Sequence, residues 1–449
     1  MTKEPSSIEK FNNWSKNSVG VRIFTIVFLI LILLIPVSMV ENLIRERERY
    51  QENAMYEISD KWGAHQTITG LVVSVPYYTY STTKEKGITK THKHKHYAHF
   101  LPSELNIKGK ITPEKRYRGI YEVVVYKGDL SIEGAFDDID PDKLGLDSQN
   151  INWAGATLNL GVSDLRSIQN DVFVDWNGQQ LNFNPGLPSD DIVKSGISTN
   201  INIGKTFKKQ QFKVNLKLNG SEGISFTPLG KTTKVSINSN WADPSFNGAF
   251  LPDNRKISKD GFTADCEVLH LNRNYPQEFT DNNNNIFQSN FGLDLKLPVD
   301  EYQKSMRSVK YAVMFISLTF LFYFFSQIKQ KVRIHPIQYL IIGLAICLFF
   351  TLLIALSEHM NFQYAYLIGS MAIISIITTY SFFIFKDKLI TSLLAGILIM
   401  LYGFIYVIIQ MQDFSLLIGS LGLFVILSSV MYLSRNIDWY NIGENNQAE

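Results

Sequence analysis

The stretch Val19–Val40, VGVRIFTIVFLILILLIPVSMV, decides how the rest of this chain is placed. Its one charged residue, Arg22, lies near the start. A helix needs about 20 apolar residues to cross a bilayer. The run is longer than the core of a typical signal peptide, and no small-residue cleavage site follows it. We therefore predict an uncleaved transmembrane anchor.

Five more apolar runs follow in the last third of the chain, joined by short connections. Each run is long enough for a membrane-spanning helix. Their predicted bounds are about 309–328, 337–356, 364–385, 389–410 and 415–433. Together with the anchor, they predict six transmembrane helices.

The connections between these runs differ in charge. Lys or Arg residues follow the second, fourth and sixth runs, whereas SEHMNFQ (357–363) and MQDF (411–414) contain neither. Cationic loops remain in the cytoplasm. The distribution predicts that both termini are cytoplasmic. It also predicts that the long polar segment between the first two spans lies outside the cytoplasmic membrane.

That polar segment is predicted to begin as a helix and to continue as β structure. Residues 41–66 alternate Glu and Arg with apolar residues at helical spacing, which extends the anchor. From Thr67 onward the apolar pattern has a period of two, which is typical of strands. Tight turns are expected at Asn177-Gly178, Asn219-Gly220 and Asn247-Gly248. The predicted strands include ITGLVVSVPYYTYS, GIYEVVVYKGDLSIEGAF, QQFKVNLKLNGSEGISF and TKVSINSNW.

The predicted fold class is an α+β membrane protein. Six transmembrane helices carry a large, mainly antiparallel and sandwich-like β domain between helices 1 and 2. The expected division is a cytoplasmic N-terminus (1–18), an anchor (19–40), a juxtamembrane helix (41–66), an extracytoplasmic β domain (67–308), a five-helix bundle (309–433) and a cytoplasmic tail (434–449).

Composition excludes several classes of function. The formal net charge is +2, and no long basic tract with interleaved aromatic residues occurs, so nucleic acid is not an expected partner. Cys266 and Cys347 lie far apart, one in the polar segment and one in an apolar run, which favours neither a disulfide nor a thiolate metal site. We expect no cofactor.

The histidine-rich stretch THKHKHYAHF (91–100) is the feature most suggestive of a metal site. In a strand, His92, His94 and His96 share one face, but the outer two lie about 13 Å apart, too far to ligate one ion with bonds of about 2 Å. We interpret the stretch as a solvated basic hairpin and expect no metal. No Gly-x-Ser-x-Gly elbow or convincing carboxylate pair occurs either, so we expect no enzyme.

Ionisable side chains are almost absent from the central parts of the spans and collect at their ends. Such groups are candidates for function. Glu358 and His359 end the run LIALSEH (353–359). One interpretation is that they only keep the end of a helix hydrated. The other is a packed polar cluster that ties the bundle to the β domain, in which Glu358 pairs with Arg307 or Lys310. The predicted candidates at the span ends are Arg333, His335, Glu358, His359, Arg435 and Asp438.

Several long blocks resemble the CreD family of bacterial inner-membrane proteins. The resemblance extends over about residues 20–440. The blocks include LIPVSMVENLIRERERY, GLVVSVPY, HFLPSELNIKG, SNWADPSFNGAFLP, RIHPIQYLIIGLA, LIALSEH and SRNIDWY. The family is described as an envelope-integrity factor, produced under the control of a sensor kinase and tied to tolerance of certain colicins and of β-lactam stress. No catalytic residue belongs to that description. All six span-end candidates fall in its signature blocks.

The expected function is therefore support of the cell envelope under stress by a multi-pass protein of the bacterial inner membrane. We expect it to bind an envelope component rather than to catalyse a reaction. Its expected partners are membrane lipid and an envelope lipid or peptide. The alternative is a transport or export component for a lipid or peptide, and a membrane-embedded hydrolase is the weakest hypothesis. A polar-lined bundle cavity would favour transport, whereas an apolar groove on the β domain would favour binding of an acyl chain or extended peptide.

Overall fold

The computed structural model of the protein contains two compact units, which we describe separately. The helical unit comprises Met1–Tyr50 and Val299–Glu449, and the β unit comprises Gln51–Pro298. The structure describes residues 19–85, 88–138, 144–204, 208–280, 284–295, 301–330, 332–411 and 414–435.

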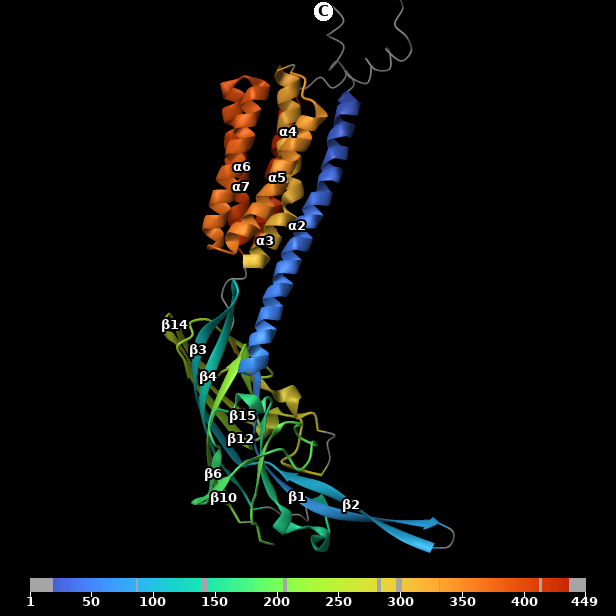
Figure 1. Cartoon of the computed structure of the whole chain (residues 1–449), viewed down its shortest axis with the longest axis vertical. Helices are drawn as coiled ribbons and strands as arrows, with labels where there is room; N and C mark the ends of the chain where they lie inside the picture. Colours follow the sequence, from blue (N-terminus) through green and yellow to red (C-terminus); the bar gives the residue numbers. More distant parts are fainter. Residues whose placement is uncertain are drawn as a thin grey trace, which may run out of the picture. The chain divides into compact units, whose positions relative to one another are not determined.

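The first helix, α2 (Val19–Trp62), contributes residues to both units (Figure 1). It contains the whole apolar run and continues through the charged segment that follows. Pro36 lies inside it, which removes one backbone hydrogen bond but is tolerated in membrane helices. The helix ends earlier than the predicted residue 66, because Gln66 already belongs to the first strand.

The helical unit adds six further helices. They are α3 (Glu301–Lys310), α4 (Ala312–Gln330), α5 (Pro336–Ser357), α6 (Phe362–Phe385), α7 (Lys388–Gln410) and α8 (Ser415–Ser434).

Of the described helices, α2, α4, α5, α6 and α7 are long and apolar enough to cross a membrane. The sixth predicted span coincides with α8, in which the apolar stretch Leu417–Tyr432 is shorter than that length. The second span begins later than predicted, because the polar helix α3 ends at Lys310 and α4 starts at Ala312. Val309 suggested an earlier start, but it is a buried residue of α3.

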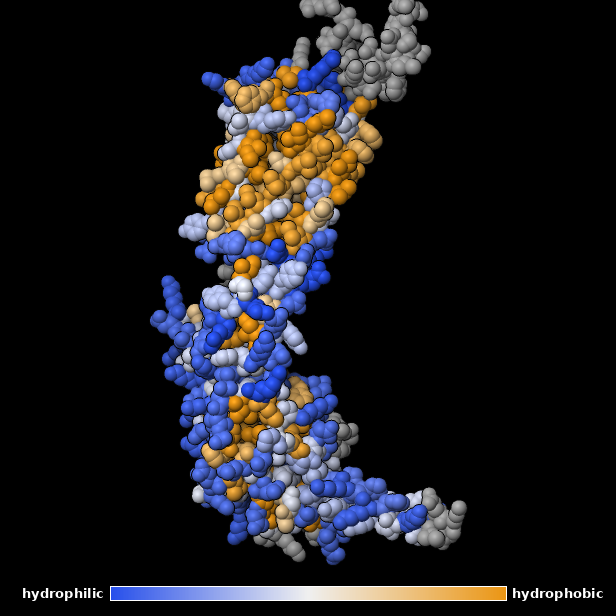
Figure 2. All heavy atoms as spheres, in the orientation of Figure 1, coloured by the Kyte–Doolittle hydropathy of each residue, from blue (hydrophilic) through white to orange (hydrophobic). Residues whose placement is uncertain are grey.

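The visible face of the helical unit is apolar between two polar ends (Figure 2). Its exposed side chains include Phe24, Phe383 and Leu389, each at least 70% exposed. An exposed apolar surface of this extent is suited to lipid rather than to water. Inside the unit, aromatic rings pack closely, and the centres of the Phe315 and Tyr402 rings are 4.5 Å apart.

Within the described residues of the β unit, one sheet has nine strands and the other has eight. The nine-stranded sheet contains β1 (Gln66–Glu85), β2 (Ile88–Phe100), β5 (Thr157–Val162), β8 (Asn184–Pro185), β9 (Gly196–Asn200), β11 (Gly223–Thr227), β13 (Pro244–Gly248), β16 (Glu278–Phe279) and β17 (Phe291–Leu295). Its main path is β13-β17-β11-β1-β5-β9-β8, and β2 pairs with β1 and β16.

The eight-stranded sheet has the order β14-β15-β12-β3-β4-β10-β6-β7. Its strands are β3 (Glu104–Arg118), β4 (Tyr121–Phe136), β6 (Phe173–Trp176), β7 (Gln179–Asn182), β10 (Gln210–Ser221), β12 (Thr232–Ser239), β14 (Asn254–Ser258) and β15 (Gly261–Leu269).

The two sheets share one hydrophobic core. Leu105 of β3 packs against Gly70 of β1, where an added methyl group would lie 2.8 Å from the leucine side chain. The Tyr126 hydroxyl of β4 donates to the Gly223 carbonyl of β11 at 3.0 Å. The alternating apolar residues therefore face each other between the sheets, as in a sandwich.

Most described strand pairs are antiparallel, but two are parallel and were not foreseen. β1 pairs with β11 from Gln66 and Ile224, and β3 pairs with β12 from Glu104 and Thr232. Parallel neighbours require long connections, so local sequence patterns carry no signal for them.

The predicted turns have different outcomes. Asn177-Gly178 forms the two-residue turn between β6 and β7, with positive φ at both positions, which is the geometry that this dipeptide favours. Asn247 and Gly248 are the last two residues of β13 and both pair with β17, so the tight turn predicted there is not formed, although Gly248 has a positive φ of 92°. The turn predicted at Asn219-Gly220 is wrong, because both residues continue β10 beside β4. Gly220 is there because the Tyr126 ring occupies the space that a side chain would need.

Candidate functional site

A polar cluster surrounds Glu358, which caps the C-terminus of α5. Arg47 of α2 lies 3.6 Å from the carboxylate, and the Tyr302 hydroxyl of α3 donates a hydrogen bond to it at 3.3 Å. The Glu358 side chain is only 11% exposed. The helix dipole disfavours a carboxylate at this end, and the two partners offset that effect.

Arg47 and Tyr302 occupy the place expected for Arg307 or Lys310. The first turn of α3 reaches Glu358, and Lys310 lies eight residues further along the same helix, a rise of about 12 Å. All three members of the observed cluster belong to the helical unit. They join α2, α3 and α5 within that unit.

The other predicted residues lie apart from this cluster. His359 is exposed. His335 caps the opposite end of α5, where its ring accepts from the Ile337 amide at 3.3 Å. Arg333 is exposed near that end, and the Arg435 guanidinium lies 4.0 Å from the centre of the Tyr432 ring. Asp438 lies outside the described residues.

Neutral hydrogen bonds between spans were missed by the sequence interpretation. The Tyr339 hydroxyl of α5 donates to Gln327 of α4 at 3.2 Å, and Tyr323 of α4 bonds to Ser381 of α6. No apolar pattern distinguishes such residues from their neighbours. In a membrane they hold helices together without placing a charge in lipid.

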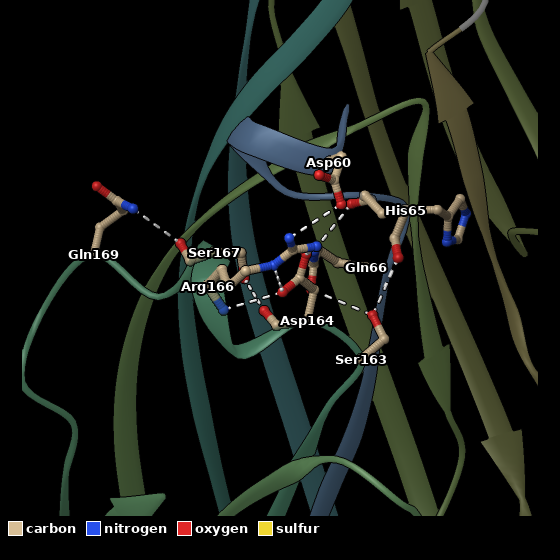
Figure 3. A network of polar contacts seen from close by, with 9 residues as sticks. Asp60, His65, Gln66, Ser163, Asp164, Arg166, Ser167 and Gln169 are labelled. Carbon is tan, nitrogen blue, oxygen red and sulfur yellow. Dashed lines mark hydrogen bonds and ion pairs between the residues drawn. The ribbon is translucent and has the colours of Figure 1, made fainter. Parts of the chain in front are cut away.

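The end of α2 is held in the β unit by a dense network of polar contacts (Figure 3). Arg166, in the 3-10 turn η4 (Leu165–Ser167), donates to both carboxylate oxygens of Asp164 and to Asp60 of α2, all at 3.0 Å. Hydrogen bonds from Arg166 are the largest cause that holds the pKa of Asp164 below its ordinary value. This residue joins the helix to the connection after β5.

Further contacts fix the same helix end. The Trp62 indole donates to the Tyr126 carbonyl at 3.3 Å, and the Arg116 guanidinium lies 4.5 Å from the centre of the indole ring. The Ser221 hydroxyl donates to Ser59 at 2.7 Å. Contacts from three directions make this junction a structural anchor rather than a ligand site.

A buried Ser–His–Asp set is the constellation that sequence interpretation missed. Ser74 of β1 and His99 of β2 are directly paired in the sheet, and both are at most 2% exposed. The Ser74 hydroxyl lies 2.9 Å from His99 Nδ1, and His99 Nε2 lies 3.1 Å from Asp191. Asn159 of β5 donates to the Ser74 hydroxyl at 2.8 Å.

With a neutral imidazole, these contacts form one chain of donors from Asn159 to Ser74, His99 and Asp191. The hydrogen bond from His99 is the largest cause that lowers the pKa of Asp191. The adjoining cavity has a volume of about 20 Å³, which suits about one water molecule. Ser74 is therefore closed to a substrate, and the chain of bonds pins the β8–β9 connection onto the sheet.

An open groove of about 660 Å³ lies beside this buried set. The β8–β9 connection forms one wall, with Asp190, Asp191 and Lys194, and the sheet contributes Thr67, Thr69 and Ser163. Phe287, in the 3-10 turn η6 (Ile286–Ser289), lines the groove and is 48% exposed. The groove thus combines charged, hydroxyl and amide groups with the apolar side chains of Val162, Ile192, Val193 and Phe287. Its lining is mixed, rather than the apolar lining considered in the sequence analysis.

The histidine-rich stretch forms most of β2. His94 and His96 bond to Ser81 and Thr79 across the strand pair, at 2.8 and 3.0 Å. His99 differs from them because it points into the buried set. Among the described residues, no three His, Cys, Asp or Glu side chains are placed to hold a metal ion.

A cavity of about 440 Å³ lies between α4, α7 and α8. Leu318, Phe322, Met400 and Val425 are among its lining residues, and Ser429 is its one hydroxyl-bearing residue. It lacks the polar lining that would favour transport of a hydrophilic solute.

Apolar helices that follow and precede a large β unit define a multi-pass membrane protein with an inserted globular domain. Comparison with known proteins gives the family. A model of the family described as inner membrane protein CreD matches residues 18–440. The chain is also 31% identical to inner membrane protein CreD of Escherichia coli (strain K12), over 92% of this chain and 91% of that protein. The protein belongs to the CreD family and is a multi-pass inner-membrane protein.

Proposed function

We propose that the protein supports the integrity of the cell envelope under stress by binding an envelope component through its β unit. In this proposal both termini are cytoplasmic and the β unit lies outside the cytoplasm, as the charges of the connections indicate. Binding, rather than catalysis, is the activity.

The open groove beside the β8–β9 connection carries this proposal. Its volume is within the range of pockets that bind small ligands. Lys194, the carboxylates of Asp190 and Asp191, and the amides of Asn284 and Asn285 offer hydrogen bonds. Phe287 offers an apolar face. This mixture favours a ligand with both polar and apolar parts, such as an envelope glycopeptide or peptide.

The buried set supports binding over hydrolysis. Ser74 is covered, and its neighbouring cavity has room for about one water molecule. An acyl substrate needs a nucleophile that it can reach and donors for its oxyanion. The same contacts hold the groove wall in one position, which reduces the entropy lost on binding.

The experiment compares Phe287→Ala with Leu271→Ala in full-length protein. Leu271, in the 3-10 turn η5 (His270–Asn272), is 80% exposed and does not line the groove. Each variant is expressed in a strain that lacks the wild-type gene, and survival is measured under β-lactam stress. Molecules that co-purify with each variant are identified by mass spectrometry.

We expect wild type and Leu271→Ala to protect cells and to retain the same envelope molecule. Phe287→Ala should lose both at an unchanged protein level. Full protection by Phe287→Ala, with the same molecule retained, would contradict the proposal.

The alternative is a component that transports or exports a lipid. The apolar groove between α4, α7 and α8 favours a lipid over a peptide in that role. Movement of a fluorescent lipid between leaflets by reconstituted protein, unaffected by Phe287→Ala, would support this alternative over binding at the β unit.

A further inference from the structure

The outer parts of β1 and β2 form a two-stranded ribbon that projects from the β unit (Figure 1). The strands stay paired from Val73 and Phe100 to Glu85 and Ile88. β5 pairs with β1 only as far as Ser74, and β16 pairs with β2 only at His99 and Phe100. Beyond an isolated bridge at Tyr77, no other described strand joins the ribbon.

One face of the ribbon is cationic and aromatic. Cross-strand pairs place Tyr78 opposite Lys95 and Tyr80 opposite Lys93, so these four side chains share a face. The Lys93 ammonium lies 3.6 Å from the centre of the Tyr78 ring, and the Tyr80 side chain is 57% exposed. Lys84 belongs to the same face by its register. The opposite face carries His92, His94 and His96, and His94 and His96 bond there to the hydroxyl groups of Ser81 and Thr79.

The lysines of this face have no acidic partner in the part of the chain that the structure describes. No described carboxylate forms an ion pair with Lys93 or Lys95, whose contacts are with tyrosine rings. In the sequence, residues 78–97 contain five lysines, of which Lys84, Lys93 and Lys95 belong to this face, and a single acid, Glu85. The chain as a whole has a formal net charge of only +2, so the positive charge is concentrated here.

Lysines also protect exposed strand edges from aggregation, and that role explains some charge on the ribbon. It does not require a particular sign, because either charge repels a second copy of the edge. It also does not explain why the lysines lie over tyrosine rings on one face. A sign-dependent function is therefore separable from edge protection by experiment.

We propose that this face of the ribbon binds a phosphate-bearing envelope glycan. Lys93 and Lys95 are about 7 Å apart along the strand and can each contact one phosphate as a point charge. The exposed Tyr80 ring offers a flat surface for a sugar, and the threonines between the lysines offer hydroxyl groups. Ile88, at the tip, is the one large aliphatic residue in 78–97, so the ribbon lacks the apolar side chains needed to enter a bilayer.

Charges at the base of the ribbon limit where the glycan lies. Lys95 and Tyr97 line a depression with Asp190 and Asp191, and these carboxylates disfavour a phosphate close to the β8–β9 connection. The anionic groups should therefore lie on the side of Lys95 that faces Lys93, away from these carboxylates. The site is separate from the groove proposed above and does not depend on the ligand of that groove.

The test measures binding of a defined probe to full-length protein in detergent. The probe is a deacylated, phosphorylated lipopolysaccharide core oligosaccharide, and its dephosphorylated form is the comparison. The variants are Lys93→Glu with Lys95→Glu, and Lys93→Arg with Lys95→Arg. The matched control is Lys256→Glu with Lys259→Glu, on the exposed β14–β15 hairpin.

We expect charge reversal on the ribbon to weaken binding by about tenfold or more, with arginine and the control pair close to wild type. Binding should weaken as salt screens the charges, and removal of the phosphates should abolish it. Unchanged affinity after charge reversal, equal binding of the dephosphorylated glycan, or binding only to vesicles of anionic phospholipid would overturn the proposal.

Two further measurements separate this proposal from the proposed function. Phe287→Ala should leave binding of the glycan probe intact. Charge reversal on the ribbon should leave the molecule that co-purifies through the groove unchanged. If charge reversal also removed that molecule, the ribbon would not be an independent site and the proposal would be wrong.

Discussion

The helical unit and the β unit bury polar side chains in different ways. Among the described residues of the helical unit, the buried hydrogen bonds between spans are neutral, as between Tyr339 and Gln327. In the β unit charged groups are buried as well: Arg273 is 8% exposed and donates to the carbonyls of Tyr275 and Leu229. The ion pair between Arg47 of α2 and Glu358 is placed at the C-terminal end of α5, where Glu358 caps the helix.

This difference indicates that the medium around each unit, lipid or water, sets the free-energy cost of burying polar groups inside that unit. A charge in a span has lipid on its outer side and no water to reach when a partner moves. A charge in the β unit remains a short distance from water and can be compensated by backbone carbonyls. The following predictions test this comparison, from the largest effect to the smallest.

The largest effect is expected from labelling, because it is all or none. In a chain with Cys266 and Cys347 replaced by Ser, a single cysteine at Asn361 should react with an impermeant reagent added outside the inner membrane. A cysteine at Lys388 should react only after permeabilisation. The reason is that Lys and Arg retain their loops in the cytoplasm. The reverse pattern would place the β unit on the cytoplasmic side and remove the basis of the comparison.

Removal of the buried Arg273 should be the most destabilising of the substitutions. Arg273→Met leaves the Tyr275 and Leu229 carbonyls without their donor, with an expected cost of about 3 kcal/mol. Thermal unfolding of the full-length protein measures it, and Arg255→Met, at an exposed position of β14, is the control. Equal melting temperatures for the two variants would show that buried charge contributes little to the β unit.

Asp191→Asn should reduce stability by about 1 kcal/mol and should change its pH dependence. The pKa of Asp191 is lowered in the folded state, first by its hydrogen bond from His99. A lowered pKa contributes stability above the ordinary aspartate value, and that stability is lost as pH falls through the folded-state value. Wild type and variant should therefore differ at neutral pH and converge in acid, as measured by denaturant unfolding. A constant difference at every pH would contradict this assignment.

The Arg47–Glu358 pair should have the smallest effect on stability. Arg47 is 40% exposed, and ion pairs of this kind contribute about 0.5 kcal/mol. Glu358→Gln and Arg47→Gln should each lower the melting temperature slightly, and exchanging the two charges should restore part of the loss. His359→Asn is the control, because His359 is exposed.

The same variants address function. If the cluster has a role beyond hydration of a helix end, Glu358→Gln should also reduce survival under envelope stress at an unchanged protein level. Survival equal to wild type for Glu358→Gln and Arg47→Gln would leave the cluster a purely structural one.

Hydropathy and period-two patterning predicted most elements of the fold. The apolar helices and the strands around GLVVSVPY and YEVVVYKG are local features, and local sequence is enough to specify them. The start of α4 and the turn at Asn219-Gly220 were misplaced because tertiary contacts decide them. Val309 is buried in α3, and Asn219 and Gly220 pair with β4, where the Tyr126 ring leaves no room for a side chain at Gly220.

The sites were harder to predict because their members are distant in sequence. Glu358 was identified, but its partner Arg47 lies on the first helix. Ser74, His99 and Asp191 meet only through sheet pairing and the β8–β9 connection. One local signal was available: His99 lies between the apolar residues Ala98 and Phe100, unlike the histidines that alternate with lysine. That context is typical of a buried histidine.

The central position of β1 has a consequence for biosynthesis. Thr69 and Thr227, whose hydroxyl groups are 3.1 Å apart, are separated by 158 residues. A chain made from its N-terminus can form the β1–β2 ribbon early, but the first residues of β1, Gln66–Thr69, must wait until β11 has been synthesised. In the proposed orientation β11 must also cross the membrane before it can pair. An exposed strand edge binds other chains, so the interval between these two events is when the protein most needs a chaperone on the far side of the membrane.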